Sequence, residues 1–516
     1  MMDLDRDACY RAMAARDPRF DGRFFTCVTS TGIFCRSICP ARTPKLQNCI
    51  FVPSAAAAHA AGFRPCLRCR PEIAPGLGSW RGTANTVSRA LALINEGALD
   101  EASVEHLAER VGVGARHLRR LFEEHLGAAP VVVAQVHRIL FAKLLLSETQ
   151  LPMVEIALAS GFGSIRRFNS VMRRTYSRPP RELRRARSKD PAAADAAAIT
   201  LRLPFRQPYH WPTMLGFLGP RAIPGVELVE PGRYRRTISV DDAVGTVEVA
   251  PVPGAAYLRA TIRIPAVTAL GRVVGRLRRL FDLDADPAAI EGHLARDPVL
   301  AQAIAARPGL RVPGAWDNFE LAIRAMLGQQ VSVAAATTLA GRLAAAYGER
   351  IPGAPAGLDR LFPTPEALAA ADLAAIGMPG ARARAIAALA AAMAADRELL
   401  RPFETLDATV EKLSRLPGIG PWTAQYIALR ALREPDAFPA SDLGLLRAAA
   451  TEAGRPSPAS LLARAEAWRP WRAYAALHLW MSEGEAAIPA AKGQRGAARH
   501  RPARETGEAG LASAGE

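Results

Sequence analysis

Cysteine is missing from most of this chain. The sequence has 516 residues, and all seven of its cysteines lie at or before Cys69. The remainder of the chain therefore has no thiol chemistry, which excludes an iron–sulfur cluster held by a distal cysteine quartet. Any cysteine-bound metal must lie in the N-terminal part.

Lysine is also scarce, because only five of the 66 Lys and Arg residues are lysines. The formal net charge is +17 and the isoelectric point is about 10.2. Such an excess of positive charge is typical of proteins that bind a polyanion such as DNA. A GC-rich genome would enrich arginine and alanine as well, so the charge favours nucleic-acid binding without deciding it.

Uninterrupted apolar runs of membrane length are missing too, and the start of the sequence lacks the pattern expected of a leader. Arg or Asp interrupts the Ala-rich stretch around residues 385–395, and the first ten residues are acidic rather than basic and then apolar. Hydrophobic residues make up 50% of the chain, which is enough for real cores. We expect an unexported cytoplasmic protein with no membrane partner, folded into three or four domains.

Two domain boundaries are marked by a Pro- and Gly-rich cluster at residues 71–78 and by an Ala-rich segment at 190–195. Short β-like runs at 246–249 and 257–262 indicate a change from a helical to a strand-like pattern. We expect a small cysteine-bearing domain (1–78), a helical domain (80–188), a linker (189–198), an antiparallel β subdomain (199–270), a second helical domain (271–485) and a disordered tail (486–516).

Four cysteines form two short-spaced pairs with 26 residues between them. The pairs are Cys35 with Cys39 and Cys66 with Cys69. Each pair can chelate from one tight turn, so the spacing predicts a four-thiolate zinc site. Reduced structural cysteines are the alternative, because this segment uses cysteine freely elsewhere.

Residues 31–36 and 61–69 resemble the metal-binding N-terminal domain of Ada over residues 1 to about 75. In that family the first cysteine of the quartet, here Cys35, accepts a methyl group from a methylphosphotriester in DNA. Zinc keeps a thiolate deprotonated, and the thiolate is the nucleophile. Methylation would remove one negative charge beside DNA and so raise DNA affinity. Arg42 and Arg64 are candidate phosphate contacts, with a purely solubilising role as the alternative.

Two helix-turn-helix patterns follow, at residues 103–122 and 152–173, each with a Gly turn between its helices. They resemble the AraC-type DNA-binding domain, although Ser177 stands where that family usually has Gly. The resemblance implies recognition helices at 115–123 and 164–173 in successive major grooves. An ordinary helical bundle is the alternative. The candidate contacts to bases or phosphates are Arg116, Arg119, Arg166, Arg167 and Asn169.

Residues 416–426 predict a tight hairpin between two helices, in which the backbone N–H groups around Gly418 and Gly420 suit a DNA phosphate. Asp442 follows Trp422 by twenty residues. This pairing resembles the helix-hairpin-helix DNA glycosylases, and residues 199–485 resemble the AlkA family of 3-methyladenine glycosylases. The resemblance implies that Asp442 stabilises positive charge on the sugar during hydrolysis. Without the hairpin, a plain helix N-cap would be the better interpretation of Asp442.

The same resemblance implies that Trp422, Tyr426 and Trp480 line the pocket for the flipped base, where stacking and cation–π contacts would hold an alkylated purine. For Trp468 and Trp471 core packing is the better interpretation. Relatives that also nick the strand have Lys where this chain has Trp422, so we expect a monofunctional glycosylase. Gln330 stands at the position of a Leu that wedges into the DNA, which leaves the lesion range open.

The expected fold is multidomain and mainly α with α+β parts: a small zinc domain, an all-α double helix-turn-helix domain, and a glycosylase with an antiparallel β subdomain and a helix-hairpin-helix domain. The expected function is an alkylation-damage response protein, a DNA-3-methyladenine glycosylase II fused to a zinc-thiolate methyl acceptor and transcription regulator. Zinc is the expected cofactor, with no iron–sulfur cluster. The expected partners are alkylated and promoter double-stranded DNA, and RNA polymerase. The alternatives are a DNA-binding regulator with an inert glycosylase domain, and a purely structural zinc.

Overall fold

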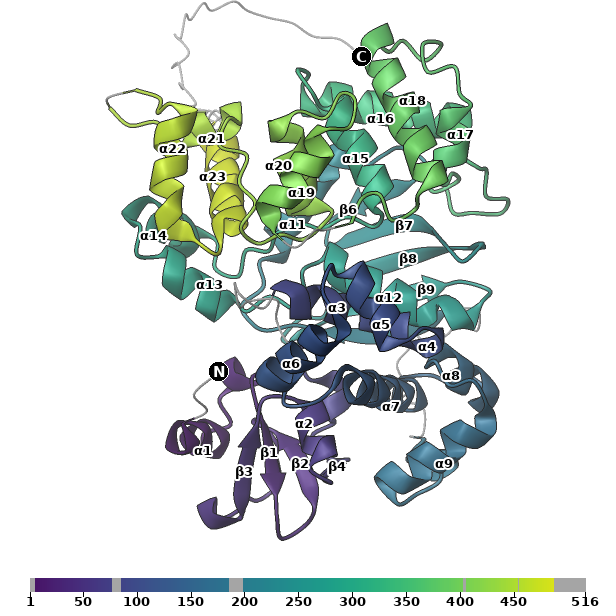
Figure 1. The fold of residues 1–516 in the computed structure, drawn as a ribbon, viewed down its shortest axis with the longest axis vertical. Coiled ribbons are helices and arrows are strands. Elements are labelled where there is room, and N and C mark those ends of the chain that lie inside the picture. The colour runs from purple at the N-terminus through teal and green to yellow at the C-terminus, as the bar shows by residue number, and fades with distance from the viewer. Residues whose placement is uncertain (1–4, 77–84, 185–197, 402–404, 453, 487–516) are drawn as a thin grey trace, which may run out of the picture.

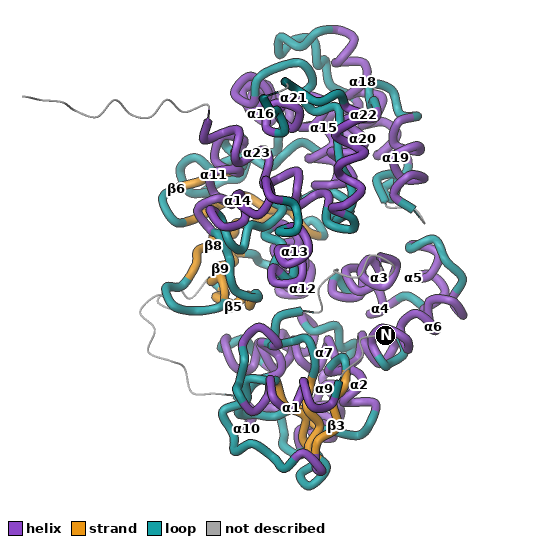
Figure 2. The backbone as a smooth tube through the Cα atoms, turned by 90° about the vertical axis from the view of Figure 1, so that its left-hand side faces the viewer, coloured by secondary structure: helices purple, strands orange, loops and turns teal. Residues whose placement is uncertain are grey.

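The computed structural model describes residues 5–76, 85–184, 198–401, 405–452 and 454–486 (Figure 1). Nearly all of the expected linker (189–198) and tail (486–516) lies outside these residues. The N-terminal and helix-turn-helix parts lie together at one end of the molecule, and helices of the C-terminal part form the other end (Figures 1 and 2).

The N-terminal part is built on a four-stranded sheet with the order β3-β1-β2-β4. Strand β1 is antiparallel to β2 and β3, whereas β2 and β4 are parallel. Gly32 closes the β1–β2 hairpin at a φ of +64°, a region that favours glycine. The strands are β1 (Phe25–Val28), β2 (Ile33–Arg36), β3 (Cys49–Val52) and β4 (Arg64–Pro65), and the helices are α1 (Arg6–Ala14) and α2 (Ala55–Ala60).

The second part is entirely helical. Its helices are α3 (Asn85–Asn95), α4 (Ala98–Glu101), α5 (Val104–Arg110), α6 (Ala115–Leu126), α7 (Pro130–Glu148), α8 (Met153–Ala159), α9 (Ile165–Tyr176) and α10 (Pro180–Leu183). Ser103 and Ser164 cap α5 and α9, since each side chain accepts a backbone N–H three residues ahead. Helices α6 and α9 run three residues further than expected, because Leu126 and Tyr176 are buried there.

Helix α7 is the one described helix that is long and apolar enough to cross a membrane by length and composition. This is weak support for a membrane span, because a buried core helix passes the same test. The apolar side chains of α7 lie largely inside the protein, packed against α8 and strand β5 of the third part.

The third part begins with an antiparallel five-stranded sheet of order β5-β9-β8-β7-β6. The strands are β5 (Ile199–Pro204), β6 (Glu227–Glu230), β7 (Arg233–Val240), β8 (Ala243–Pro251) and β9 (Tyr257–Arg263), with α11 (Trp211–Leu218) between the first two. Both β-like runs of the sequence lie in this sheet, within β8 and β9.

Helices complete the third part. They are α12 (Leu270–Leu280), α13 (Pro287–Leu294), α14 (Pro298–Ala306), α15 (Asn318–Leu327), α16 (Val333–Tyr347), α17 (Pro365–Ala369), α18 (Gly380–Ala395), α19 (Leu406–Ser414), α20 (Pro421–Arg430), α21 (Leu443–Ala448), α22 (Pro458–Ala465) and α23 (Arg472–Ala486). One hydrophobic core joins the sheet to α12, α21 and α23 and extends into α7–α9, whereas α15, α16, α18 and α20 enclose a second core.

Ion pairs cross between the parts as well. Arg23 of the N-terminal part lies 2.7 Å from Asp286 at the start of α13. Arg110 at the end of α5 lies 3.0 Å from Glu398, which follows α18. The three parts therefore contact one another directly, in addition to being connected along the chain.

Candidate active site and metal centre

The hairpin expected at residues 416–426 joins α19 to α20. Gly418 has a φ of +76°, and a Cβ atom there would lie only 2.6 Å from the Cβ atom of Ala385. Gly420 is the N-cap of α20, and a Cβ atom there would meet no neighbour within 4 Å. The first glycine is thus required by the fold, and the second keeps the outer face of the bend open for a close approach to its backbone.

A side chain of the α15–α16 loop ties that loop to the hairpin. The Gln329 amide Nε2 donates to the Gly418 carbonyl and to the Thr423 hydroxyl, each at 2.8 Å. The neighbouring Gln330 is exposed and has a φ of +58°. The expected wedge residue therefore lies at the tip of a loop that the hairpin holds in place.

Asp442 is the N-cap of α21, and three N–H groups fix its carboxylate. Oδ1 accepts from the Leu445 backbone N–H at 3.0 Å and from Trp480 Nε1 at 2.8 Å. Oδ2 accepts from Trp422 Nε1 at 2.9 Å. Asp442 is therefore a helix N-cap, which was the other interpretation of this residue from the sequence. A cap needs only the backbone N–H, so the two indole hydrogen bonds indicate a further role.

A cavity of about 660 Å³ contains Asp442 together with Trp422, Tyr426 and Trp480. The rings of Trp422 and Tyr426 are stacked with centroids 5.5 Å apart, and Trp480 meets Tyr426 edge-on at 6.2 Å. This volume lies in the range of ordinary ligand pockets. Trp422 and Tyr426 lie on α20, which begins at the hairpin, whereas Asp442 caps α21 and Trp480 lies on α23. The sequence-predicted catalytic and pocket residues therefore lie together in one cavity near the hairpin.

Trp468 and Trp471 belong to the core, where they are 2% and 5% exposed. The prediction that these two tryptophans pack in the interior is confirmed. Sequence reasoning missed the cavity-lining residues Phe217, Arg221 and Arg430. The spacing of Phe217 and Arg221 by four residues, one helical turn, was the available signal.

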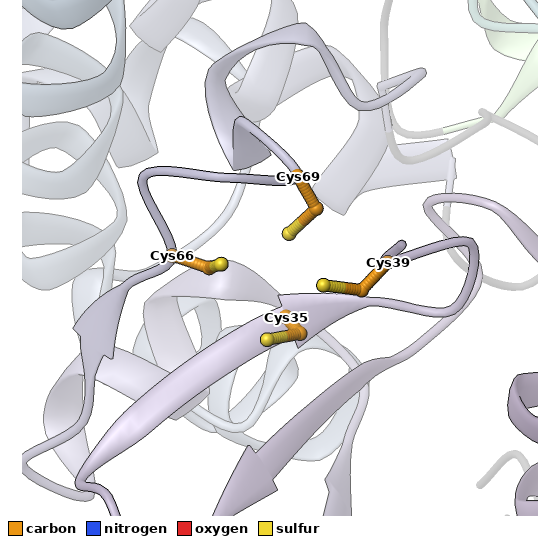
Figure 3. A group of neighbouring side chains, drawn as sticks. All are labelled: Cys35, Cys39, Cys66 and Cys69. Atoms are coloured by element: carbon orange, nitrogen blue, oxygen red, sulfur yellow. The ribbon is translucent and has the colours of Figure 1, made fainter. Parts of the chain in front are cut away.

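The four paired cysteines converge as predicted. Cys35 comes from β2 and Cys66 directly follows β4, so the parallel pairing of these two strands brings the two halves of the site together. Figure 3 shows all four side chains turned toward a common centre. Their Sγ atoms lie within 4.8 Å of one another. Tetrahedral zinc with Zn–S bonds of about 2.3 Å needs sulfur atoms roughly 3.8 Å apart, so this donor set fits zinc.

The remaining cysteines do not take part in this cluster. Cys9, Cys27 and Cys49 are buried in the N-terminal part, where burial raises the pKa of Cys27 to about 12. Within the cluster, Cys35 is partly exposed, whereas Cys66 and Cys69 are buried. The metal centre therefore presents Cys35 toward the surface.

The candidate DNA contacts of the N-terminal and helix-turn-helix parts lie on the surface. Arg116 and Arg119 of α6 and Arg166 and Arg167 of α9 are exposed, whereas Asn169 is half-buried. The Arg119 guanidinium forms an ion pair with Glu105 at 2.6 Å. In the N-terminal part, Arg42 is exposed and Arg64 is half-buried.

Four family models match successive parts of the chain. They are the metal binding domain of Ada (residues 8–72), a helix-turn-helix domain (107–186), the AlkA N-terminal domain (200–317) and the HhH-GPD superfamily base excision DNA repair protein (323–473). A solved 3-methyladenine DNA-glycosylase from Archaeoglobus fulgidus shares the fold over 56% of this chain and 99% of its own, with a TM-score of 0.50 and 23% identity. The expected fold class is confirmed.

Two curated relatives extend this similarity. DNA-3-methyladenine glycosylase 2 of Escherichia coli is 40% identical over 55% of this chain and 97% of its own length. A Mycobacterium tuberculosis protein described as a "probable bifunctional transcriptional activator/DNA repair enzyme AlkA" is 43% identical over 93% of this chain and 97% of its own. The chain therefore belongs to the family of the bifunctional transcriptional activator/DNA repair enzyme AlkA.

Proposed function

We propose that this protein is a DNA glycosylase that hydrolyses the N-glycosidic bond of alkylated purines of the 3-methyladenine type, fused to a methyl-accepting zinc module and a DNA-binding transcription regulator. The observation that carries the proposal is the Asp442 carboxylate, held by two indole N–H groups in an aromatic cavity near the glycine hairpin between α19 and α20. Asp442 and Cys35 are the proposed catalytic residues.

Breaking the bond between the sugar and the purine leaves positive charge on the deoxyribose, while the electron pair departs with the base. The Asp442 carboxylate stabilises that charge, and its three hydrogen bonds fix both oxygens before the reaction begins. A water molecule then adds to the sugar and loses a proton. The products are an abasic site and the free purine.

The aromatic cavity holds the flipped base. Trp422, Tyr426 and Trp480 supply flat, electron-rich surfaces at which a cationic purine gains stacking and cation–π energy. None of the described residues that line the cavity is a lysine. An amine that would attack the sugar and lead to strand cleavage is therefore missing from this lining, which supports a monofunctional reaction.

The hairpin around Gly418 and Gly420 grips the phosphate backbone, and Gln330 fills the space that the flipped base leaves. The open face at Gly420 lets a phosphate approach the backbone N–H groups closely. The two hydrogen bonds of Gln329 hold the loop of Gln330 against the hairpin, which keeps the proposed phosphate-binding and base-replacing residues close together. A polar wedge can hydrogen-bond the unpaired base, which a leucine cannot do.

Cys35 accepts a methyl group from a methylphosphotriester. Zinc, when bound by Cys35, Cys39, Cys66 and Cys69, keeps the four sulfur atoms as thiolates at neutral pH. The Cys35 sulfur forms a bond to the methyl carbon, and the triester oxygen keeps the electron pair as an ordinary diester. The half-exposed position of Cys35 supports this role over that of the buried Cys66.

Exposed arginines of α6 and α9 would contact promoter DNA, and Arg42 and Arg64 would contact phosphates near the methylated site. A regulator of this kind acts through RNA polymerase, which we propose as a protein partner. We also propose a cytoplasmic or nucleoid location, where DNA and polymerase are found. The proposed site roles of Arg116, Arg119, Arg166, Arg167 and Asn169 rest on their position on the two recognition helices.

The deciding experiment compares release of methylpurine from methylated duplex by the full chain and by Asp442→Asn. Asn keeps the cap to Leu445 but removes the charge, so we expect a loss of at least about 100-fold. Equal release by both proteins would leave only the alternative, a DNA-binding regulator with an inert glycosylase domain. For Cys35, mass spectrometry after exposure to methylphosphotriester DNA should find one added methyl group, and an unmodified Cys35 would make the zinc purely structural.

A further inference from the structure

Four arginines line the cavity that contains Asp442: Arg221, Arg324, Arg430 and Arg447. The first three differ in how their charge is balanced. Arg324 pairs with Glu227 at 2.7 Å and with Glu320 at 3.2 Å. Arg430 donates to two backbone carbonyls and to the Tyr426 hydroxyl, the last at 2.8 Å. Arg221 differs from both, because among the described residues it has no acidic partner and it donates to one backbone carbonyl; the Tyr426 phenol also interacts with it.

Arg221 carries a charge that no acid balances. Its Nη1 donates to the Phe217 carbonyl at 3.0 Å, and its guanidinium carbon lies 3.9 Å from the centroid of the Phe217 ring. Within the part of the chain that the structure describes, no carboxylate lies at ion-pair distance from it. Burial lowers the pKa of Arg221, the phenol of Tyr426 offsets part of this effect, and the nearby charge of Arg324 lowers the pKa further.

The pKa of the Tyr426 phenol is shifted by the same positive charges. Burial alone would raise the pKa of Tyr426, but the charges of Arg430, Arg221 and Arg324 hold it below its usual value. This end of the cavity is therefore positive, although the substrate expected from the proposed function is itself a cation. Such a field costs binding energy for a cationic base.

The positive field that weakens the binding of a cationic base favours cleavage of the bond between the base and the sugar. When the electron pair moves onto the purine, a cationic base becomes neutral and a neutral base becomes an anion, so the charge of the base falls by one unit in both cases. A fixed positive group beside the base favours that change equally for both. Only the cationic base is repelled before the reaction.

We infer that Arg221 is a specificity-determining residue that stabilises the electron pair taken up by the departing purine, and that its charge weakens the binding of cationic damaged purines but not of neutral ones. This inference rests on the proposed function. A neutral purine leaves with the electron pair of the bond and takes up one proton from water, whose oxygen adds to the sugar. A cationic purine leaves neutral, and the proton of that water goes to solvent.

The test uses the full chain in single-turnover excision from two duplexes, one with 7-methylguanine, which is cationic, and one with hypoxanthine, which is neutral. Arg221→Met removes the charge and keeps the stem, and Arg221→Lys restores the charge. We expect Arg221→Met to lower the maximal rate about tenfold or more on both duplexes. The protein concentration for half-maximal rate should fall on 7-methylguanine and stay unchanged on hypoxanthine.

Arg221→Lys should recover most of the rate, which a packing role would not predict. Arg233→Met serves as the matched control, because Arg233 is an exposed arginine on β7. If thermal unfolding shows that Arg221→Met is destabilised, Arg221→Gln replaces it, since Gln also lacks the charge but keeps an N–H donor for the Phe217 carbonyl.

The inference is overturned if the neutral variants keep the wild-type rates, if half-saturation shifts by the same factor on both duplexes, or if the wild type releases 7-methylguanine but no hypoxanthine. The proposed function fails separately, by the absence of 7-methylguanine release from the wild type or its persistence in Asp442→Asn.

Discussion

At the scale of single residues, the indole of Trp422 has two separable roles, because its ring stacks on Tyr426 and its N–H orients Asp442. Trp422→Phe keeps an aromatic ring and removes the N–H. A hydrogen bond to a charged group is worth about 1.5–3 kcal/mol, so we expect the excision rate constant to fall by roughly 10- to 100-fold. Single-turnover kinetics on methylated duplex would measure this loss.

Trp468→Phe is the matched control for that variant. The Trp468 indole also donates to a carboxylate, that of Asp297 at 3.0 Å, but Asp297 caps α14 and does not line the cavity. The control should lose stability and keep the rate constant of excision. A rate loss of similar size in both variants would show that the effect of Trp422→Phe is a general consequence of weakened packing.

The buried His478 should make the stability of the fold sensitive to acid. This side chain of α23 is 1% exposed, and burial, with a smaller contribution from the charge of Arg307, lowers its pKa from 6.5 to about 4. Because the folded pKa is depressed, the folded state binds fewer protons. The stability is fully present above about pH 6.5 and is lost as the pH falls toward 4, by up to about 3 kcal/mol.

Urea unfolding at several pH values would measure this loss, with His478→Leu as the comparison. The variant should show a shallower fall of the unfolding free energy between pH 6.5 and 4.5. Part of the fall will remain, because burial also lowers the pKa of His137 in α7 to about 4. Parallel pH profiles for the two proteins would contradict the assignment to His478.

The sequence was informative about residues whose chemistry is rare and whose spacing is short. The cysteine pairs and the interval from Trp422 to Asp442 were visible in the chain, and the structure brings each set together. Arg221 was not singled out, since its four-residue spacing from Phe217 is a weak signal in a chain with so many arginines. Its significance comes from the missing carboxylate, which is a property of the fold and not of the local sequence.

At the scale of elements, the two glycines of the hairpin differ in what they do. Gly418→Ala places a methyl group at positive φ against Ala385, so we expect it to lower the unfolding free energy by about 1–3 kcal/mol. Gly420→Ala meets open space and should leave stability nearly unchanged while it weakens binding to abasic duplex. Urea unfolding and DNA titration of both variants would check this; equal destabilisation would contradict it.

Helix ends were more predictable than strand pairing. Ser103 and Ser164, the first residues of two segments that the sequence predicts as helical, are helix caps in the structure, and capping is a local interaction. The four-stranded sheet of the N-terminal part was not anticipated, since its strands have at most four residues. Its parallel β2–β4 pair joins residues about thirty positions apart, and no local periodicity encodes such a contact.

At the scale of the whole molecule, a buried ion network joins the metal centre to both other parts. Arg70, which directly follows the ligand Cys69, lies 2.9 Å from Glu72 and 3.2 Å from Glu148 at the end of α7. The other oxygen of Glu148 accepts the backbone N–H of Arg202 in β5 at 2.8 Å. One carboxylate thus links the residue after a zinc ligand to the helix-turn-helix part and to the glycosylase sheet.

Zinc removal should therefore destabilise the glycosylase part and not the N-terminal part alone. Six of the seven tryptophans follow residue 199 and none precedes residue 80, so tryptophan fluorescence reports on the distant part. We expect a chelator to lower the melting temperature seen by fluorescence by a few degrees, since each kcal/mol shifts it by about 2–4 °C in domains of this size. Glu148→Gln weakens the link at its centre, so in that variant the chelator should shift the fluorescence transition less. A wild-type transition that does not respond to the chelator would mean that the network, although buried, transmits no stability from the metal centre to the sheet.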